Sequence, residues 1–204
     1  KLRGKAEIEE GARSDFIVIT ELPYQVSPNQ FIVKVKELVD NRELVIVMTQ
    51  AQYIKSVSDD SFRSQGRGGR GVSGAKMKDA DIVRNVIFTT SHAYLLFFSN
   101  RGRVYRLRAL EIPERERTAK GIPIVNLLPL QNGETIQAII DTREFPGTRY
   151  LFFVSRQGQV KKTLLEQYSR PRQNGIAAIT IKEDDELLEA KLTNGKSQIL
   201  VAVK

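Results

Sequence analysis

The sequence predicts a mainly β protein: a propeller-like array of about three four-stranded blades, preceded by a small α/β segment. Two observations predict the array. From Leu44 onward, short apolar runs alternate with Gly and Asn turns, and this pattern recurs about every 50 residues. A third observation, a helical spacing of apolar residues before position 40, predicts the α/β segment. A plain β-sandwich is the less favoured alternative, because that fold is not expected to keep such a period.

The α/β segment covers residues 1–43. A weak alternation at Lys5–Glu10 and a β-rich run at Asp15–Leu22 predict strands there. Ser27 can cap a helix, and Pro28 suits the first helical position because its missing N–H costs nothing there. A helix over 28–40 would bury one apolar face, which comprises Phe31, Ile32, Val35, Leu38 and Val39.

The blades are predicted over residues 44–204, and each repeat opens with a hairpin. The paired runs are 44–49 with 52–55, 94–99 with 103–106, and 150–155 with 159–162. Gly102 and Gly158 occupy the turns of the later copies, where a positive φ is easiest for glycine. Ala51 takes that place in the first copy, so we expect its turn to differ.

Each repeat continues with two further strands. Gly71, Gly121 and Gly175 begin matching strands, and polar, acid-containing turns follow at 78–81, 131–134 and 183–186. Each of these turns leads into another apolar strand. A fourth copy opens at 197–203, so we expect the array as given to leave an open blade edge, which is a liability for stability.

Composition narrows the classes of function. The 204 residues are 41% hydrophobic and 27% charged and include no cysteine, which excludes disulfides, cysteine-ligated zinc and thiol nucleophiles. The single histidine, His92, excludes a multi-histidine metal site and is expected to be an ordinary turn residue. No apolar run reaches the length of a membrane span and no signal-peptide pattern is present, so we expect a cytoplasmic protein with no membrane partner.

The net charge of +8 is unevenly distributed. Residues 1–43 carry seven basic and eight acidic side chains, whereas 44–204 carry 25 basic and 16 acidic ones. The basic surplus therefore belongs to the predicted blades, where it would attract polyanions through counterion release.

The sharpest local motif is the glycine-rich run Gln65–Gly71, which reads Gln-Gly-Arg-Gly-Gly-Arg-Gly. Its uncovered backbone N–H groups can approach an anion, and Arg67 and Arg70 add guanidinium groups that fit phosphate. A flexible connector with solvated arginines is the alternative interpretation. The run is not a Walker loop, because no Gly-Lys-Ser/Thr follows.

This run resembles the signature box at the start of the C-terminal domain of the DNA gyrase A subunit, whose pattern is Gln-Arg-Arg-Gly-Gly-Arg/Lys-Gly. The matching positions are Gln65, Arg67, Gly68, Gly69, Arg70 and Gly71, whereas Gly66 replaces the first arginine. The segments Gln52–Lys55, Phe97–Arg106, Thr118–Leu127 and Asp184–Leu187 also resemble that domain, so the resemblance covers all of 44–204.

Residues 1–43 resemble a different part of the same family. Glu21–Val26 is similar to a segment of the breakage-reunion domain, which in the family is separated from the C-terminal domain by a long stretch. Here the two parts meet near Asn41–Leu44. An internal deletion, an engineered or misassembled fragment, or a sequence that lacks the intervening residues would each explain the junction.

The resemblance implies a β-pinwheel whose basic outer rim binds and wraps duplex DNA and so supports ATP-dependent negative supercoiling by the holoenzyme. The partners it implies are double-stranded DNA and, within the holoenzyme, the gyrase B subunit together with a second A subunit. ATP and Mg²⁺ would belong to the B subunit, so this chain would hold no metal or cofactor. The family's catalytic tyrosine follows an arginine and precedes a threonine. Only Tyr150 follows an arginine here, but Leu151 comes next, so this chain is expected to have no catalytic residue and to be inactive alone.

The expected DNA contacts are the box and the basic residues of the three blades. Beyond the box they are Lys55, Arg63, Arg101, Arg103, Arg106, Arg108, Arg156, Lys161, Lys162, Arg170 and Arg172. Two alternative functions remain open at this point. One is the corresponding C-terminal domain of topoisomerase IV, whose box is usually degenerate, and the other is a basic propeller-like module that binds proteins.

Overall fold

The computed structural model describes residues 5–9, 16–22, 27–29, 31–32, 35, 40–58 and 81–198. It divides the chain into two compact units, Lys1–Asn41 and Arg42–Lys204. In the first unit, β1 (Lys5–Glu9) pairs antiparallel with β2 (Phe16–Glu21). Pro28, Asn29, Phe31, Ile32 and Val35 are helical, and the remainder of the helix predicted over 28–40 lies outside the described residues.

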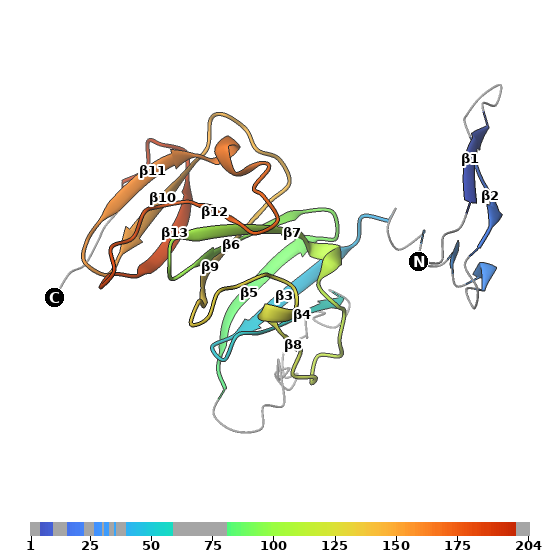
Figure 1. The fold of residues 1–204 in the computed structure, drawn as a ribbon, viewed down its shortest axis with the longest axis horizontal. Coiled ribbons are helices and arrows are strands. Elements are labelled where there is room, and N and C mark those ends of the chain that lie inside the picture. The colour runs from blue at the N-terminus through green and yellow to red at the C-terminus, as the bar shows by residue number, and fades with distance from the viewer. Residues whose placement is uncertain are drawn as a thin grey trace, which may run out of the picture. The chain divides into compact units, whose positions relative to one another are not determined.

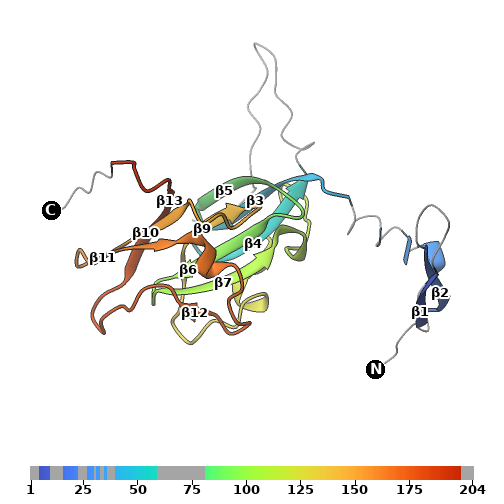
Figure 2. The ribbon, with the colours of Figure 1, turned by 90° about the horizontal axis from the view of Figure 1, so that it is seen from above.

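The described part of the second unit forms three antiparallel sheets that follow one another in chain order (Figures 1 and 2). The first sheet has the strand order β5 (Val83–Thr90), β3 (Glu43–Thr49), β4 (Tyr53–Ser58), β8 (Ile122–Pro123). The second has the order β12 (Ile176–Ala177), β7 (Arg103–Arg108), β6 (Tyr94–Ser99), β9 (Ile136–Thr142). The third has the order β11 (Val160–Leu164), β10 (Tyr150–Ser155), β13 (Leu187–Thr193). The prediction of a mainly β, blade-like fold is confirmed.

Within the described residues, three short 3₁₀ helices connect these strands. They are η2 (Ala109–Glu111), η3 (Ile124–Asn126) and η4 (Leu165–Tyr168). The η2 helix follows the second hairpin and η4 follows the third, at equivalent places in their repeats.

The strands expected to begin at Gly121 and Gly175 are present, but they join the sheet of the preceding repeat. β8 pairs with β4, and β12 pairs with β7, so each of the first two blades is completed by a two-residue strand from the next repeat. This crossing requires glycine. A Cβ on Gly121 would lie 2.6 Å from the Ile54 carbonyl oxygen, and a Cβ on Gly175 would lie 2.7 Å from the Tyr105 ring. The matching Gly71 lies outside the described residues.

Two apolar cores hold the blades together. One includes Ile46, Met48 and Ile54 of the first blade, and the other includes Phe153 and Leu165 of the third. The strand β6 belongs to both, because its side chains alternate between its two faces. Its Leu95 and Phe97 lie in the first core, whereas its Leu96 and Phe98 lie in the second. The unbroken run of buried residues from Leu95 to Ser99 therefore reflects a strand packed on both sides.

All three hairpins use the same turn, which corrects the expectation that the first would differ. The residue equivalent to Gly102 and Gly158 is Gln52, with φ of 65° against 72° and 82°. Its N–H donates to the Thr49 carbonyl at 3.1 Å, as that of Gly102 does to Ser99 at 2.9 Å. Gln52 offsets the strain of its left-handed backbone with a bond that glycine cannot make. Its side-chain amide accepts from the N–H of Ile136 at 2.7 Å and donates to that residue's carbonyl at 3.2 Å.

Candidate nucleic-acid interface

The cation at the centre of β4 does not face solvent. Lys55 is only 3% exposed, and its ammonium donates to the carbonyl oxygens of Glu116, Arg117 and Ala119, the last at 2.8 Å. Burial, with a smaller contribution from the charge of Arg117, lowers the pKa of Lys55. An ammonium has three N–H donors, and these carbonyls occupy them. The expectation that Lys55 contacts a phosphate is therefore corrected. Its strand position suggested that it lies on the rim, but its side chain points into the protein.

Two arginines of β7 perform the same task in the second blade. Arg103 donates to the carbonyl oxygens of Asn174 and Gly175, and Arg106 donates to that of Ser169. The guanidinium of Arg106 also stacks 4.7 Å from the centroid of the Tyr94 ring. Both arginines are half-buried, so they serve mainly to hold the loop that leads into β12.

We call the two crossing segments, 113–121 and 169–175, the rim loops. Each wraps over the preceding blade and is held there by basic side chains of that blade, which donate to its backbone. Four basic side chains of the loops themselves point outward: Arg115, Lys120, Arg170 and Arg172 are all exposed. Thus Lys55, Arg103 and Arg106 of the strands position the loops, whereas the four basic side chains of the loops are exposed to solvent.

The remaining second-blade candidates are exposed but not idle. Arg101 donates to the Gln131 side chain at 3.0 Å and to the Asn132 carbonyl at 2.6 Å. Arg108 donates to the Tyr94 hydroxyl at 3.4 Å. That bond and the charge of Arg108 lower the pKa of Tyr94.

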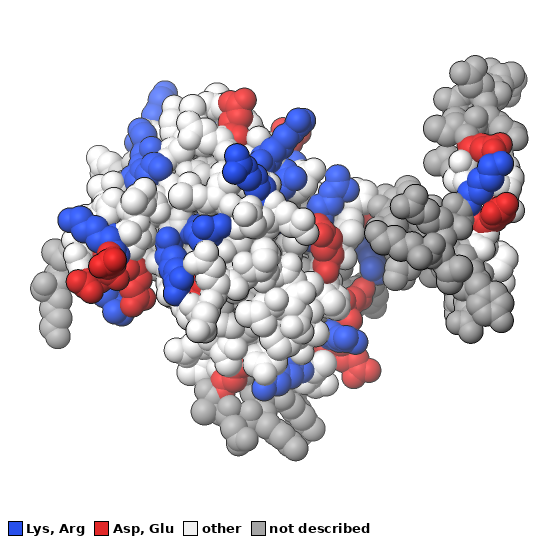
Figure 3. Space-filling model, in the orientation of Figure 1, with Lys and Arg blue, Asp and Glu red and all other residues white. Residues whose placement is uncertain are grey.

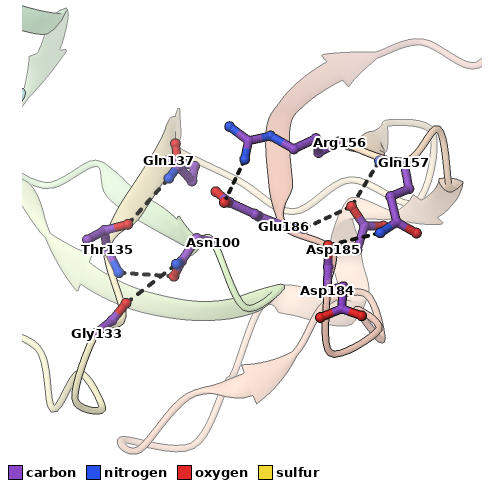
Figure 4. A network of polar contacts seen from close by, with 9 residues as sticks. All are labelled: Asn100, Gly133, Thr135, Gln137, Arg156, Gln157, Asp184, Asp185 and Glu186. Carbon is purple, nitrogen blue, oxygen red and sulfur yellow. Dashed lines mark hydrogen bonds and ion pairs between the residues drawn. The ribbon is translucent and has the colours of Figure 1, made fainter.

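In the third blade, Arg156 belongs to a polar network at the β10–β11 turn (Figure 4). It pairs with the Glu186 carboxylate at 3.0 Å, while the N–H of Gln157 donates to Asp185 at 2.9 Å. The exposed Lys161 donates to the Ala178 carbonyl at 2.7 Å, and the ammonium of Lys162 lies 4.8 Å from the centroid of the Tyr150 ring. The exposed ion pair of Arg156 with Glu186 is weak enough to yield to a phosphate.

The same network links the second and third blades. The side chain of Asn100 accepts from the N–H of Thr135 at 3.0 Å. Its backbone carbonyl accepts from the N–H of Leu187 at 2.8 Å. The turn of the second hairpin is therefore bonded to the residue just before β9, the last strand of its own blade. It is also bonded to Leu187, the first residue of β13 in the third blade.

A groove of about 870 Å³ lies between the second blade and the loops beside it. Its lining includes Arg106, Asn126, Arg172 and Asn174, and thus combines two basic side chains with amide groups. Elsewhere, lysine and arginine side chains are spread over the face seen in Figure 3 and do not gather in one patch. A distributed set of cations suits an extended polyanion better than a small anion.

Sequence reasoning omitted Arg115 and Lys120 from the candidate contacts. An alignment of the repeats through Gly121 and Gly175 would have found them, because it places Arg115–Lys120 opposite the segment that contains Arg170 and Arg172. The box residues Gln65, Arg67, Gly68, Gly69, Arg70 and Gly71, together with Arg63, lie outside the described residues.

Among the described residues, no group of three His, Cys, Asp or Glu side chains could hold a metal ion. Tyr150 is the half-buried first residue of β10, and His92 is half-buried in the turn before β6. Within the same residues, no helix has the length and apolar character needed to cross a membrane.

A family model for the DNA gyrase C-terminal domain, a β-propeller, matches residues 43–90, 93–143 and 149–194. These three ranges correspond to the three repeats. The match leaves out residues 1–42.

Among curated relatives, the DNA gyrase A subunit of Streptococcus pyogenes serotype M1 is 47% identical over 167 residues, which cover 81% of this chain and 20% of the relative. The same subunit of Streptococcus pneumoniae serotype 4 is 44% identical over 170 residues, or 83% of this chain and 21% of the relative. That of Halalkalibacterium halodurans is 41% identical over 179 residues, or 88% and 22%. The chain therefore spans about a fifth of the length of the relatives it matches.

Comparison with solved structures finds the same fold in known C-terminal domains. A crystal structure of the C-terminal domain of DNA topoisomerase IV has a TM-score of 0.65 and 29% identity, and the match covers 77% of this chain and 47% of that one. A structure of the DNA gyrase A C-terminal domain has a TM-score of 0.59 and covers 74% of this chain and 48% of that one. Its identity of 23% supports a common fold.

Proposed function

Because this chain belongs to the family of DNA gyrase C-terminal β-propeller domains, we propose that it is the DNA-binding and DNA-wrapping part of a gyrase A subunit. Duplex DNA bends around its basic rim and contacts the exposed cations of successive blades. The observation that carries this proposal is the repeated rim loop, which presents exposed cations at equivalent places beside the first and second blades. Wrapping needs many phosphate contacts and little base reading, and cations repeated from blade to blade supply such contacts.

The holoenzyme context follows from the same membership. In the cytoplasm, this chain would present the wrapped DNA to a holoenzyme that also contains the gyrase B subunit and a second A subunit. That holoenzyme would carry out strand passage. ATP and Mg²⁺ would act in the B subunit. Gyrase is favoured over topoisomerase IV because the curated relatives at 41–47% identity are gyrase A subunits, whereas the topoisomerase IV domain is 29% identical.

The test is ligation of relaxed, nicked circular DNA in the presence of the full 204-residue chain, followed by measurement of the linking number. Wrapping predicts a shift of one sign that grows with protein and fades as salt rises. DNA binding without a shift would show that this chain binds but does not wrap. Absence of salt-dependent binding would overturn the proposal and favour the protein-binding module.

A paired substitution separates the box from the rim. We expect Arg67→Ala with Arg70→Ala to reduce the linking-number shift more than the DNA affinity, because the box would direct the wrap. Arg170→Ala with Arg172→Ala should instead lower the affinity and the shift together. Equal losses in both assays for the box variant would contradict this division.

A further inference from the structure

The rim loop 113–121 is attached to the first blade by two neighbouring residues of β4. The N–H of Ser56 donates to the Pro113 carbonyl at 3.2 Å, and its hydroxyl donates to that of Ile112 at 2.9 Å. The Ser56 carbonyl accepts from the N–H of Arg115 at 2.9 Å. Together with the buried ammonium of Lys55, these contacts bind the loop at both of its ends.

The attached loop presents basic side chains. The side chain of Arg115 is exposed and has no polar partner within the described part of the chain. Lys120 is exposed as well, and its ammonium lies 4.0 Å from the centroid of the Tyr53 ring, which holds it against the blade. Of the nearby acids, Glu114 is paired with Arg42 at 3.0 Å, and Glu116 is exposed. Asp81 also lies close to Lys120: desolvation works to raise the pKa of the Asp81 carboxyl group, hydrogen bonds outweigh it, and the charge of Lys120 helps to lower the pKa further.

The choice of lysine at position 55 has a chemical reason. Burial of an ammonium is costly unless its donors are satisfied, and the carbonyls of Glu116, Arg117 and Ala119 satisfy them. These carbonyls belong to neighbouring residues of the loop, so a single side chain sets the path of the backbone from 116 to 119. An uncharged side chain of the same length would remove this donor from all three carbonyls. The Glu116 carbonyl would keep only the N–H of Ala119, at 3.0 Å.

We propose that Lys55 and Ser56 are positioning residues, which hold the rim loop 113–121 so that Arg115 and Lys120 contact DNA phosphates. This inference rests on the proposed DNA-binding function and assigns a contact that lies outside the glycine-rich box. Lys55 contacts no DNA itself. Its charge is used inside the protein, and its effect on DNA is transmitted through the shape of the loop.

The contact is tested with R115A/K120A in the full chain, by DNA affinity measured over a range of salt concentrations. Each phosphate contact contributes a slope of about 0.9 in the logarithm of affinity against the logarithm of salt, so loss of two should reduce the slope by about 1.8. K182A/K191A is the matched control for charge, because it removes two exposed lysines of the third blade that belong neither to the rim loops nor to the expected DNA contacts. A reduction no greater than in the control would overturn the contact, whereas failure of the unsubstituted chain to bind DNA would instead overturn the proposed function.

The positioning role is tested with K55M, which leaves every exposed charge in place. We expect its salt slope to fall toward that of R115A/K120A, and hydrogen exchange at the amides of Arg115 and Ala119 to accelerate. An unchanged slope in a folded K55M would overturn the role of Lys55. If K55M does not fold, S56A, which removes the hydroxyl bond to Ile112, tests the same anchor by the same two measurements, and an unchanged slope there would overturn it.

Discussion

The two junctions between blades solve one problem with different side chains. At the first junction, Gln52 adopts a left-handed backbone and its amide clasps Ile136 of the next blade. At the second, Gly102 occupies the equivalent turn, because a Cβ there would lie 2.3 Å from the Ile179 carbonyl oxygen. The turn geometry is therefore required at both junctions, whereas glycine is required only where the backbone of another segment occupies the position that a Cβ would take.

The apolar cores at the two junctions also differ in composition. The first is mainly aliphatic, with Ile46, Met48 and Ile54 facing the second blade, and it holds the polar pair Tyr105 and Glu134. The second contains three aromatic rings packed edge to face, those of Phe98, Phe153 and Tyr168, with centroids 5.3–6.2 Å apart. Such edge-to-face pairs add to the stabilisation that burial supplies.

The largest effect is expected from Gly102→Ala. The left-handed backbone and the collision with the Ile179 carbonyl should together lower the free energy of unfolding by about 3 kcal/mol or more. Gly158→Ala is the matched control, because φ is 82° there and a Cβ would have no neighbour within 4 Å, so it should cost about 1 kcal/mol. Denaturant midpoints measure both. Equal losses would show that the crossing loop does not constrain Gly102.

The next largest effect on stability is expected from the two hydrogen bonds between Gln52 and Ile136 at the first junction. Gln52→Ala keeps the strained backbone and removes both bonds to Ile136, so it should cost about 2 kcal/mol. Gln52→Gly loses the same bonds but relieves the backbone, and should be more stable than the alanine variant by about 1 kcal/mol. The order of the two thermal unfolding midpoints decides the matter. An alanine variant more stable than the glycine variant would contradict the backbone strain, and a glycine variant as stable as the unsubstituted chain would contradict the contribution of the two bonds to Ile136.

Each core contains a buried tyrosine, and the two hydroxyl groups have different partners. Tyr105 donates to Glu134 at 2.9 Å, and burial followed by that carboxylate raises the pKa of its hydroxyl. Tyr105→Phe leaves a buried carboxylate with one donor fewer, at a cost of about 1.5 kcal/mol. Tyr168→Phe removes a 3.3 Å bond to the Ala178 carbonyl and an interaction with the Thr163 side chain, neither of which involves a charged group, and should cost about 0.5 kcal/mol. Chemical denaturation of the two variants side by side measures the difference, and a reversed order would contradict it.

The smallest effect concerns acid. Desolvation works to raise the pKa of both Asp81 and Asp185, but hydrogen bonds from Ala51 and Thr49 to the first, and from Ser155 and Gln157 to the second, outweigh it and lower both. A carboxyl group with a lowered pKa in the folded state contributes stability above its usual pKa of 3.8, and this is lost as the pH falls through the folded value. Thermal unfolding below about pH 4 should therefore change less with pH in D81N/D185N than in the unsubstituted chain. Parallel curves would show that these carboxylates do not govern acid stability.

Much of the fold could be predicted from local pattern. The hairpins, the short strands after Gly121 and Gly175, and the acid turns at 131–134 and 183–186 appear where the repeats place them. Most of the turn predicted at 78–81 lies outside the described residues. The interface was harder to predict. Arg170 and Arg172 are exposed as expected, whereas Lys55 is buried, because a central strand position does not reveal whether a later loop will cover it.

Local patterns in the sequence are enough to predict the repeat, most of the strands, the glycine-containing turns and the basic surplus, since each depends on residues close together in the chain. Three further outcomes follow from packing: the short strands join the preceding blade, Gln52 takes the place of a glycine, and Lys55 holds the rim loop. These outcomes depend on partners far apart in sequence: Lys55 meets Ala119 across 64 residues and Gln52 meets Ile136 across 84. A side chain's role at such a contact is set by which backbone arrives beside it, and that is a property of the packed blades.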